Sequence, residues 1–230
     1  MGFISRTASV LLLSMFIFEG QSIGDEWTKV FHVKKSALAS TGINKYFPLT
    51  PGRVLEFHGG DTVLTVTVTH NTETVDGVVT RVVEERESEK GKLIEVSRNF
   101  FAIDPKSKDV YYFGEDVDMY RNGKIVNHEG AWRSGLNGAK FGLFMPGTPR
   151  NGFGYYQEIA PGVAMDRAKV VSTQLKVETP AGSYEHCLKT EETTPLEPHA
   201  KEYKYFAPGV GLVQDADLKL VKQSIKLRKE

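Results

Sequence analysis

Apolar and polar residues alternate with a repeat of two along several stretches of the chain. Leu64, Val66 and Val68 are separated from one another by threonines. β-Branched residues that alternate in this way favour a β-strand with one buried face. Strand-like runs of similar character follow, joined by short turns, at 78–87, 92–103, 110–120, 168–178, 183–192, 202–213 and 218–225.

Turn sequences between these runs indicate how the strands connect. Asp76-Gly77 and Asn122-Gly123 are typical of two-residue hairpin loops, because both central residues of such a turn need positive φ. Pro208-Gly209 suits a type II turn. The sequence therefore predicts a mainly β, single-domain antiparallel meander of about ten strands, curled into a barrel or half-barrel. Residues 25–40 carry a partial helical stripe and predict a short N-terminal arm or helix.

A glycine-rich stretch, residues 130–154, interrupts this series of strands. Seven of its residues are glycine and two are proline, which excludes a long helix or an unbroken strand. It also carries many large apolar side chains and no carboxylate. We expect this crossing segment to plug or roof a curved sheet.

The N-terminus has the features of an export signal. Arg6 precedes the apolar run 8–18, which is too short to span a bilayer, and small residues follow near Gly24. We therefore expect residues 1–24 to be a signal peptide and residues 25–230 to be one β-rich domain, secreted or periplasmic. No later apolar stretch has the length of a transmembrane helix. The single cysteine, Cys187, excludes an intramolecular disulfide and favours a bacterial envelope.

The charge of the chain is balanced. The sequence has 29 basic and 29 acidic residues, and removal of residues 1–24 takes away Arg6 and Glu19, leaving 28 of each. A neutral chain lacks the clustered positive charge that binding to nucleic acid requires. We expect no nucleic-acid partner.

Several segments resemble a group of uncharacterised bacterial exported proteins. They are Asn44-Lys45-Tyr46-Phe47-Pro48-Leu49-Thr50-Pro51-Gly52, Tyr112-Phe113-Gly114-Glu115, the stretch 130–146, and Lys204-Tyr205-Phe206-Ala207-Pro208-Gly209-Val210-Gly211-Leu212-Val213. The last is similar to a motif in bacterial domains of unknown function that have a curved antiparallel sheet, distantly like periplasmic lipoprotein carriers. The resemblance implies a fold and a compartment, and it brings no catalytic residues.

No residue pattern predicts catalysis, a cofactor or a metal site. The six histidines lack the spacing that places two ligands on one face, and no nucleotide-binding glycine motif follows a strand. Cys187 lies within a strand-like run, where a lone cysteine is typically a small packing residue. Glu115, Asp116 and Asp118 are interpreted as a solvated strand end, and the run 84–87 as the charged outer edge of a strand.

These observations favour an exported, non-enzymatic binding or carrier domain of the bacterial cell envelope. Its ligand would be a lipid or another hydrophobic or amphipathic molecule, with basic side chains of the crossing segment facing an anionic head group. The two alternatives are a protein–protein interaction module of the envelope and a hydrolase that uses carboxylates such as Glu115 and Asp118. The candidate ligand-binding residues are Trp132, Arg133, Lys140, Phe141, Phe144, Arg150 and Tyr205.

Overall fold

The computed structural model describes residues 27–225 of the chain, so the predicted signal peptide, residues 1–24, lies outside the described residues. The described part is mainly β, with turns and irregular segments between the strands and one short 3-10 helix, η1 (Lys35–Ala37). The strands are β1 (Arg53–Gly59), β2 (Thr62–Val75), β3 (Val78–Glu89), β4 (Lys92–Ile103), β5 (Val110–Arg121), β6 (Lys124–Asn127), β7 (Trp132–Arg133), β8 (Lys140–Met145), β9 (Gly154–Tyr156), β10 (Glu158–Ile159), β11 (Arg167–Thr179), β12 (Gly182–Thr194), β13 (Glu197–Ala207), β14 (Gly211–Asp215) and β15 (Leu218–Ile225).

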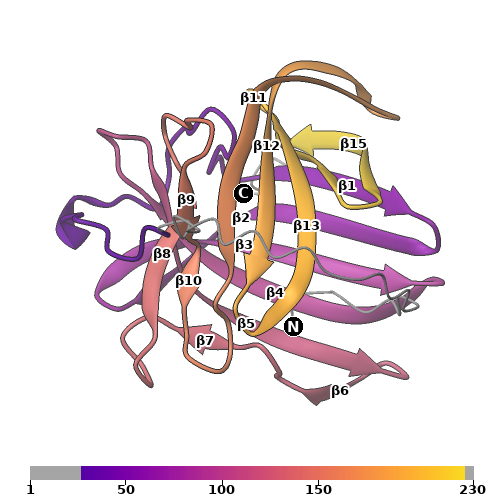
Figure 1. Cartoon of the computed structure of the whole chain (residues 1–230). Coiled ribbons are helices and arrows are strands. Elements are labelled where there is room, and N and C mark those ends of the chain that lie inside the picture. Colours follow the sequence, from indigo (N-terminus) through magenta and orange to yellow (C-terminus); the bar gives the residue numbers. More distant parts are fainter. Residues whose placement is uncertain (1–26, 226–230) are drawn as a thin grey trace, which may run out of the picture.

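All of these strands belong to one antiparallel sheet in the order β10-β8-β5-β4-β3-β2-β1-β15-β14-β13-β12-β11-β9, with β6 and β7 also paired to β5. Figure 1 shows the sheet folded into two parts, with β11–β13 crossing in front of β1–β5. We call β1–β5 the first wing and β11–β15 the second wing. The predictions of a mainly β fold and of a curved antiparallel sheet are confirmed.

The predicted number of strands and the predicted barrel are not confirmed. The sheet has 15 strands among the described residues, and its hydrogen-bonded path starts at β10 and ends at β9 without closing. Strands as short as β7 and β10, two residues each, produce no alternation that a sequence pattern reveals. The two ends of the path are consecutive in the chain, since β9 pairs with β11 and β10, which follows after Gln157, pairs with β8.

The turns form as their sequences predict. Asp76 and Gly77 have φ values of 51° and 76°, and Asn122 and Gly123 have values of 53° and 74°, the left-handed pairs that a tight hairpin requires. The arm before β1 is mostly irregular. It is attached to the sheet by isolated bridges, such as the one between Ala39 and Ile103.

The crossing segment, residues 130–154, joins the sheet instead of covering it. Trp132 on β7 pairs with Glu115, and Leu143 on β8 pairs with Tyr111, so both strands extend the edge of β5. Glycine makes the close approach of β7 to β5 feasible, because a Cβ at Gly114 would overlap the carbonyl oxygen of Trp132. The expectation of a separate plug or roof is therefore wrong.

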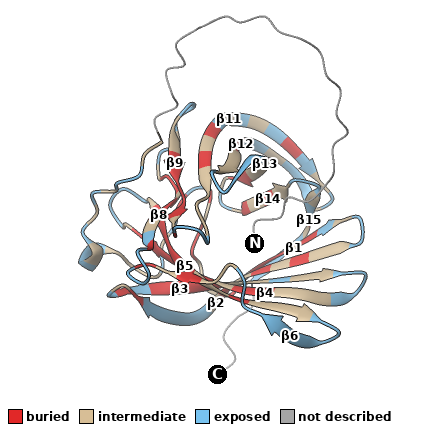
Figure 2. Cartoon of the chain, turned by 60° about the horizontal axis from the view of Figure 1, so that its bottom comes forward, coloured by how far each residue is buried: buried red, intermediate tan, exposed pale blue. Residues whose placement is uncertain are grey.

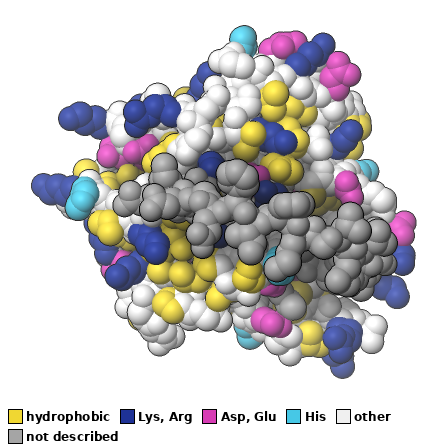
Figure 3. Space-filling model, in the orientation of Figure 1, with side chains coloured by type: hydrophobic (Ala, Val, Ile, Leu, Met, Phe, Trp, Pro, Cys, Tyr) yellow, Lys and Arg dark blue, Asp and Glu magenta, His cyan; other side chains and the backbone are white. Residues whose placement is uncertain are grey.

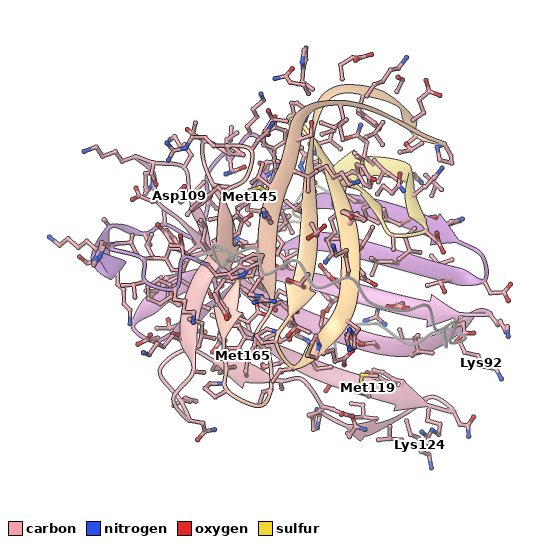
Figure 4. The ribbon with its side chains drawn as sticks, viewed as in Figure 1. Lys92, Asp109, Met119, Lys124, Met145 and Met165 are labelled. Carbon is pink, nitrogen blue, oxygen red and sulfur yellow. The ribbon has the colours of Figure 1, made fainter. Side chains whose placement is uncertain are left out.

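Buried side chains concentrate where the two wings meet (Figure 2). Leu64, Val66 and Val68 on β2 are buried, as their alternation predicts. Cys187 on β12 is fully buried, and burial raises the pKa of its thiol, which agrees with a packing role. Figure 4 shows Lys92 at the start of β4 and Lys124 at the start of β6, both at the rim of the molecule, and Asp109 beside Met145. No helix in residues 27–225 is long and apolar enough to cross a membrane.

Candidate ligand-binding cavity

A cavity of about 1340 Å³ lies between the two wings. Its walls are the inner faces of β1–β5 and of β12–β15, together with residues that flank β10. On the first wing, the apolar part of the wall is formed by side chains of β1 and β2, namely Leu55, Leu64, Val66 and Val68. The opposite wing contributes Phe206 and its register partner Leu212.

Aromatic side chains form one part of the wall. Phe47 lies 5.0 Å from Phe101 and 4.6 Å from Phe144, measured between ring centroids. Phe101 in turn stacks on Tyr112 at 4.8 Å and meets Phe144 at 4.7 Å. These four residues, Phe47, Phe101, Tyr112 and Phe144, all line the cavity, and we call them the aromatic end.

A buried polar network borders the aromatic end. The Tyr112 hydroxyl donates to the Asn99 carbonyl oxygen at 2.5 Å, and the Asn99 amide donates to the Ser97 hydroxyl at 3.1 Å. Asn99 and Ser97 lie two residues apart on β4 and therefore on the same face. Their row leads along β4 to Glu95, so the wall changes from aromatic to acidic along a single strand.

Carboxylates dominate the rest of the wall, and they alternate with residues that face outward. Glu85 and Glu87 on β3 line the cavity because their register partners on β2 are the buried Val66 and the inward-facing Leu64. Glu84 and Arg86 point to the other face. The interpretation of residues 84–87 as a wholly outer edge is therefore wrong for Glu85 and Glu87.

Register places like charges opposite one another on both wings. Glu87 on β3 is the direct partner of Glu95 on β4, and Glu192 on β12 is the direct partner of Glu202 on β13. Like charges in directly opposed cross-strand positions are destabilising. The sheet tolerates two such pairs on the walls of one cavity.

One lysine partly compensates the second wing. The Lys204 Nζ lies 3.0 Å from a carboxylate oxygen of Glu192 and 3.6 Å from one of Asp215. The Coulombic attraction of Asp215 and Glu192 outweighs the cost of burial and raises the pKa of Lys204. Lys204 therefore remains charged inside the cavity.

The acidic side chains have strongly raised pKa values. Burial, reinforced by neighbouring carboxylates, raises the pKa of Glu87 and Glu202 to about 7. Glu85 and Glu115 also reach a pKa of about 7, in each case chiefly through burial. Glu158, which is only 3% exposed, has a pKa well above its ordinary value, because of burial and then the nearby Asp166. Part of this acidic wall is thus protonated near neutral pH.

Of the residues predicted from sequence to bind a ligand, the structure places Phe144 on the cavity wall. Trp132 is buried, with its ring 5.2 Å from Tyr112, and Phe141 stacks on Phe113 at 4.8 Å. These aromatic residues are brought together at one end of the sheet, but Trp132 and Phe141 are not part of the wall.

The predicted basic residues and Tyr205 lie elsewhere. Arg133 forms ion pairs with Asp116 at 2.6 Å and with Glu73 at 3.2 Å on the outer face. Lys140 and Arg150 are exposed. The Tyr205 ring faces Lys189 at 5.4 Å and is not a wall residue. The structure therefore does not gather basic side chains around the cavity.

Glu115 and Asp118 do not form a catalytic pair. Glu115 lines the cavity, whereas Asp118 points to the opposite face, where it pairs with Arg98 at 2.9 Å and with His128 at 3.0 Å. Residues three apart on a strand point to opposite sides. Within residues 27–225, no group of three or more His, Cys, Asp or Glu side chains is arranged to hold a metal ion.

Comparison with known proteins assigns no family. No family model matches the chain, and no curated protein or solved structure matches it significantly. The resemblance to exported bacterial proteins therefore stays a prediction, and the cavity itself is the basis for a function.

Proposed function

We propose that the protein is a non-enzymatic binding or carrier protein, exported to the bacterial cell envelope, whose cavity holds a hydrophobic or amphipathic ligand. The single observation that supports this is the cavity of about 1340 Å³ with an aromatic end. Ligand sites in proteins commonly measure about 300–1,000 Å³ and combine apolar walls with a few polar groups. The cavity is therefore large enough for a ligand with an extended apolar part.

The aromatic end supplies the contacts that an apolar group needs. Phe101 is 3% exposed, and it contacts Phe47, Tyr112 and Phe144 within 5.0 Å between centroids. Aromatic rings provide large apolar surfaces of fixed geometry, which suits binding of a chain or ring. The polar remainder of the cavity would then hold the other end of an amphipathic molecule.

Native mass spectrometry of the protein purified from its host tests the proposal directly. We expect a bound mass that is lost on denaturation. The stripped protein should also take up the neutral fluorophore N-phenyl-1-naphthylamine, whose emission rises in apolar surroundings. Apo protein from the host, together with no uptake of this fluorophore, would contradict the proposal.

A matched pair of variants localises the site. Phe144→Ala removes a ring from the cavity wall, whereas Phe153→Ala removes one that packs on Tyr155 at 5.2 Å and does not line the cavity. We expect the first to weaken fluorophore binding about tenfold, as loss of a buried aromatic contact implies, and the second to leave it unchanged.

A second candidate function, an interaction module, is favoured by β6. This short strand pairs only with β5 among the described residues, and it exposes Ile125 (47%) and Val126 (50%). An apolar edge strand is able to pair with a strand of another protein. Envelope proteins that co-purify with the wild type but not with Val126→Lys would support this function.

A further inference from the structure

The cavity carries a large excess of negative charge. Its described wall residues include fourteen Asp or Glu and three Lys or Arg, although the whole chain has 29 of each class. Opposed like charges on both wings, Glu87 with Glu95 and Glu192 with Glu202, add to this excess. A charge distribution of this kind raises the local concentration of cations.

A second observation, independent of the number of acids, is that buried acceptor atoms in this wall lack donors. The Oε2 atom of Glu95 and the Oδ1 atom of Asp215 are buried and have no hydrogen-bond partner within the described part of the chain. These two residues come from different wings, and both line the cavity. Buried polar atoms are normally satisfied, and those that are not point to a missing ion, water or ligand.

Glu158 is a more deeply buried wall residue. It is 3% exposed, and its carboxylate accepts a hydrogen bond from the backbone N–H of Asp166 at 2.9 Å. No described Lys, Arg or His forms an ion pair with Glu158, nor with Glu85, Glu87, Glu95 or Glu115. Buried charges are ordinarily paired, so these five carboxyl groups lack the cationic partner that burial calls for among the described residues.

The aromatic end adjoins these carboxylates. Glu115 and Tyr112 are both wall residues of β5, and Tyr112 stacks on Phe101. The faces of aromatic rings attract ammonium and guanidinium groups, most strongly where water is excluded. The cavity therefore offers apolar surface and negative charge within one continuous wall.

Building on the proposed function, we propose that the ligand is an amphipathic cation, with its apolar part at the aromatic end and an ammonium or guanidinium group among Glu85, Glu87, Glu95 and Glu115. The cation would supply positive charge beside the buried carboxylate oxygens that lack a partner. It would also separate the opposed carboxylates of Glu87 and Glu95. On the second wing Lys204 already forms ion pairs with two wall carboxylates, those of Glu192 and Asp215.

Proton uptake is the alternative way to neutralise these groups. The raised pKa values, about 7 for Glu85 and Glu87, indicate that protons serve this role when no cation is bound. A cation that binds here has to displace protons. Binding should therefore release protons and tighten as the pH rises from 6 to 8.

Titration with three decyl compounds tests the inference. Decyltrimethylammonium, decyl maltoside and decyl sulfate share one chain and differ in head-group charge, and each is used below its micelle-forming concentration. We expect the cationic compound to bind at least about tenfold more tightly than the neutral one, and the anionic one to bind most weakly. Spermidine, a cation without an apolar chain, should bind more weakly than decyltrimethylammonium.

The outcomes separate this inference from the proposed function. Equal binding of the cationic and neutral compounds would contradict the inference that the head group is cationic, and the protein would remain a carrier of apolar ligands. Binding of none of the three would overturn both. If spermidine binds as tightly as decyltrimethylammonium, the inference that the ligand has an apolar part at the aromatic end would be wrong.

Two variants provide the control. Glu95→Gln removes an inward carboxylate that has a buried, unpartnered oxygen, whereas Glu84→Gln removes an outward one near Arg98. We expect Glu95→Gln to weaken the binding of decyltrimethylammonium about tenfold without weakening the binding of decyl maltoside. The Glu84→Gln variant should bind both compounds as the wild type does. Equal loss for both head groups in Glu95→Gln would show a merely structural effect and contradict the inference.

Discussion

The acidic residues on the inner and outer faces of the same strands differ in whether they have ion-pair partners. On the outer face of β5, Asp116 pairs with Arg133 at 2.6 Å and Asp118 with Arg98 at 2.9 Å. On the inner face of β5, Glu115 has no described ion-pair partner and a pKa of about 7, mainly through burial. The outer acidic side chains are paired with arginines, whereas the inner one has no described basic partner.

The outer surface carries charged side chains of both signs. Figure 3 shows basic and acidic side chains mixed around its margin. The same β3 strand that sends Glu84 outward, 4.0 Å from Arg98, sends Glu85 inward without a described ion-pair partner. Alternation along a strand thus separates the charges that have ion-pair partners from those that have none among the described residues.

The largest effect is expected where the inner face does contain a cation. Lys204→Met leaves Glu192 and Asp215 without their ion-pair partner, and removing one member of a buried pair costs about 3–5 kcal/mol. We expect the free energy of unfolding at pH 8 to fall by about 3 kcal/mol, since Lys204 keeps partial contact with solvent. Urea denaturation measures this. A loss smaller than that of Arg98→Gln would contradict the contrast between the faces.

The next effect concerns pH. A carboxyl whose pKa is raised on folding stabilises the protein fully below its unfolded value and loses that contribution as the pH rises through the folded value. Folding raises the pKa of four cavity carboxyls from 4.5 to about 7, namely those of Glu85, Glu87, Glu115 and Glu202. The apo protein should therefore lose at least about 2 kcal/mol of unfolding free energy between pH 5 and pH 8, measured in urea. Unchanged or increasing stability across this range would show that the pKa values of the inner carboxyls are not raised.

A smaller effect, of opposite sign, follows from relieving one opposed pair. Glu95→Gln removes the charge that faces Glu87, so we expect the apo protein to gain about 1 kcal/mol at pH 8 and to show a shallower pH profile. Thermal unfolding at pH 5 and pH 8 provides the comparison. Destabilisation of Glu95→Gln at pH 8 would mean that Glu95 has a partner on which the fold depends.

The smallest effect is expected on the outer face. Arg98→Gln removes ion pairs to Glu84 and Asp118, but the Arg98 side chain is 38% exposed. Exposed ion pairs contribute about 0–1 kcal/mol. We expect a loss of about 0.5 kcal/mol that disappears in 1 M salt. A loss comparable to that of Lys204→Met would remove the distinction between the two faces.

Local signals in the sequence were sufficient to predict the long strands and the tight turns. Leu64, Val66 and Val68 on β2 and the Asn122-Gly123 turn each encode their conformation within a few residues. The short strands of the crossing segment were not predictable in this way. They exist because β5 offers an edge with which Trp132 and Leu143 pair, and that edge is far away in the sequence.

The candidate site was less predictable than the fold. Phe144 was identified because large apolar residues in a glycine-rich stretch stand out, and it does line the cavity. Glu85 and Glu87 were assigned to the outside because charged residues are usually exposed. A signal was present, since Val83, Glu85 and Glu87 share one strand face, but the inward direction of that face depends on register with β2.

The sealed position of the lone cysteine has a practical consequence. Cys187 is fully buried, and burial raises the pKa of its thiol, so thiol reagents should leave the folded wild type unmodified. A cysteine introduced at Val163, which borders the cavity and is 48% exposed, would therefore become the single labelling position without prior removal of Cys187. An environment-sensitive dye attached there would report occupancy of the cavity from a fixed point on its rim.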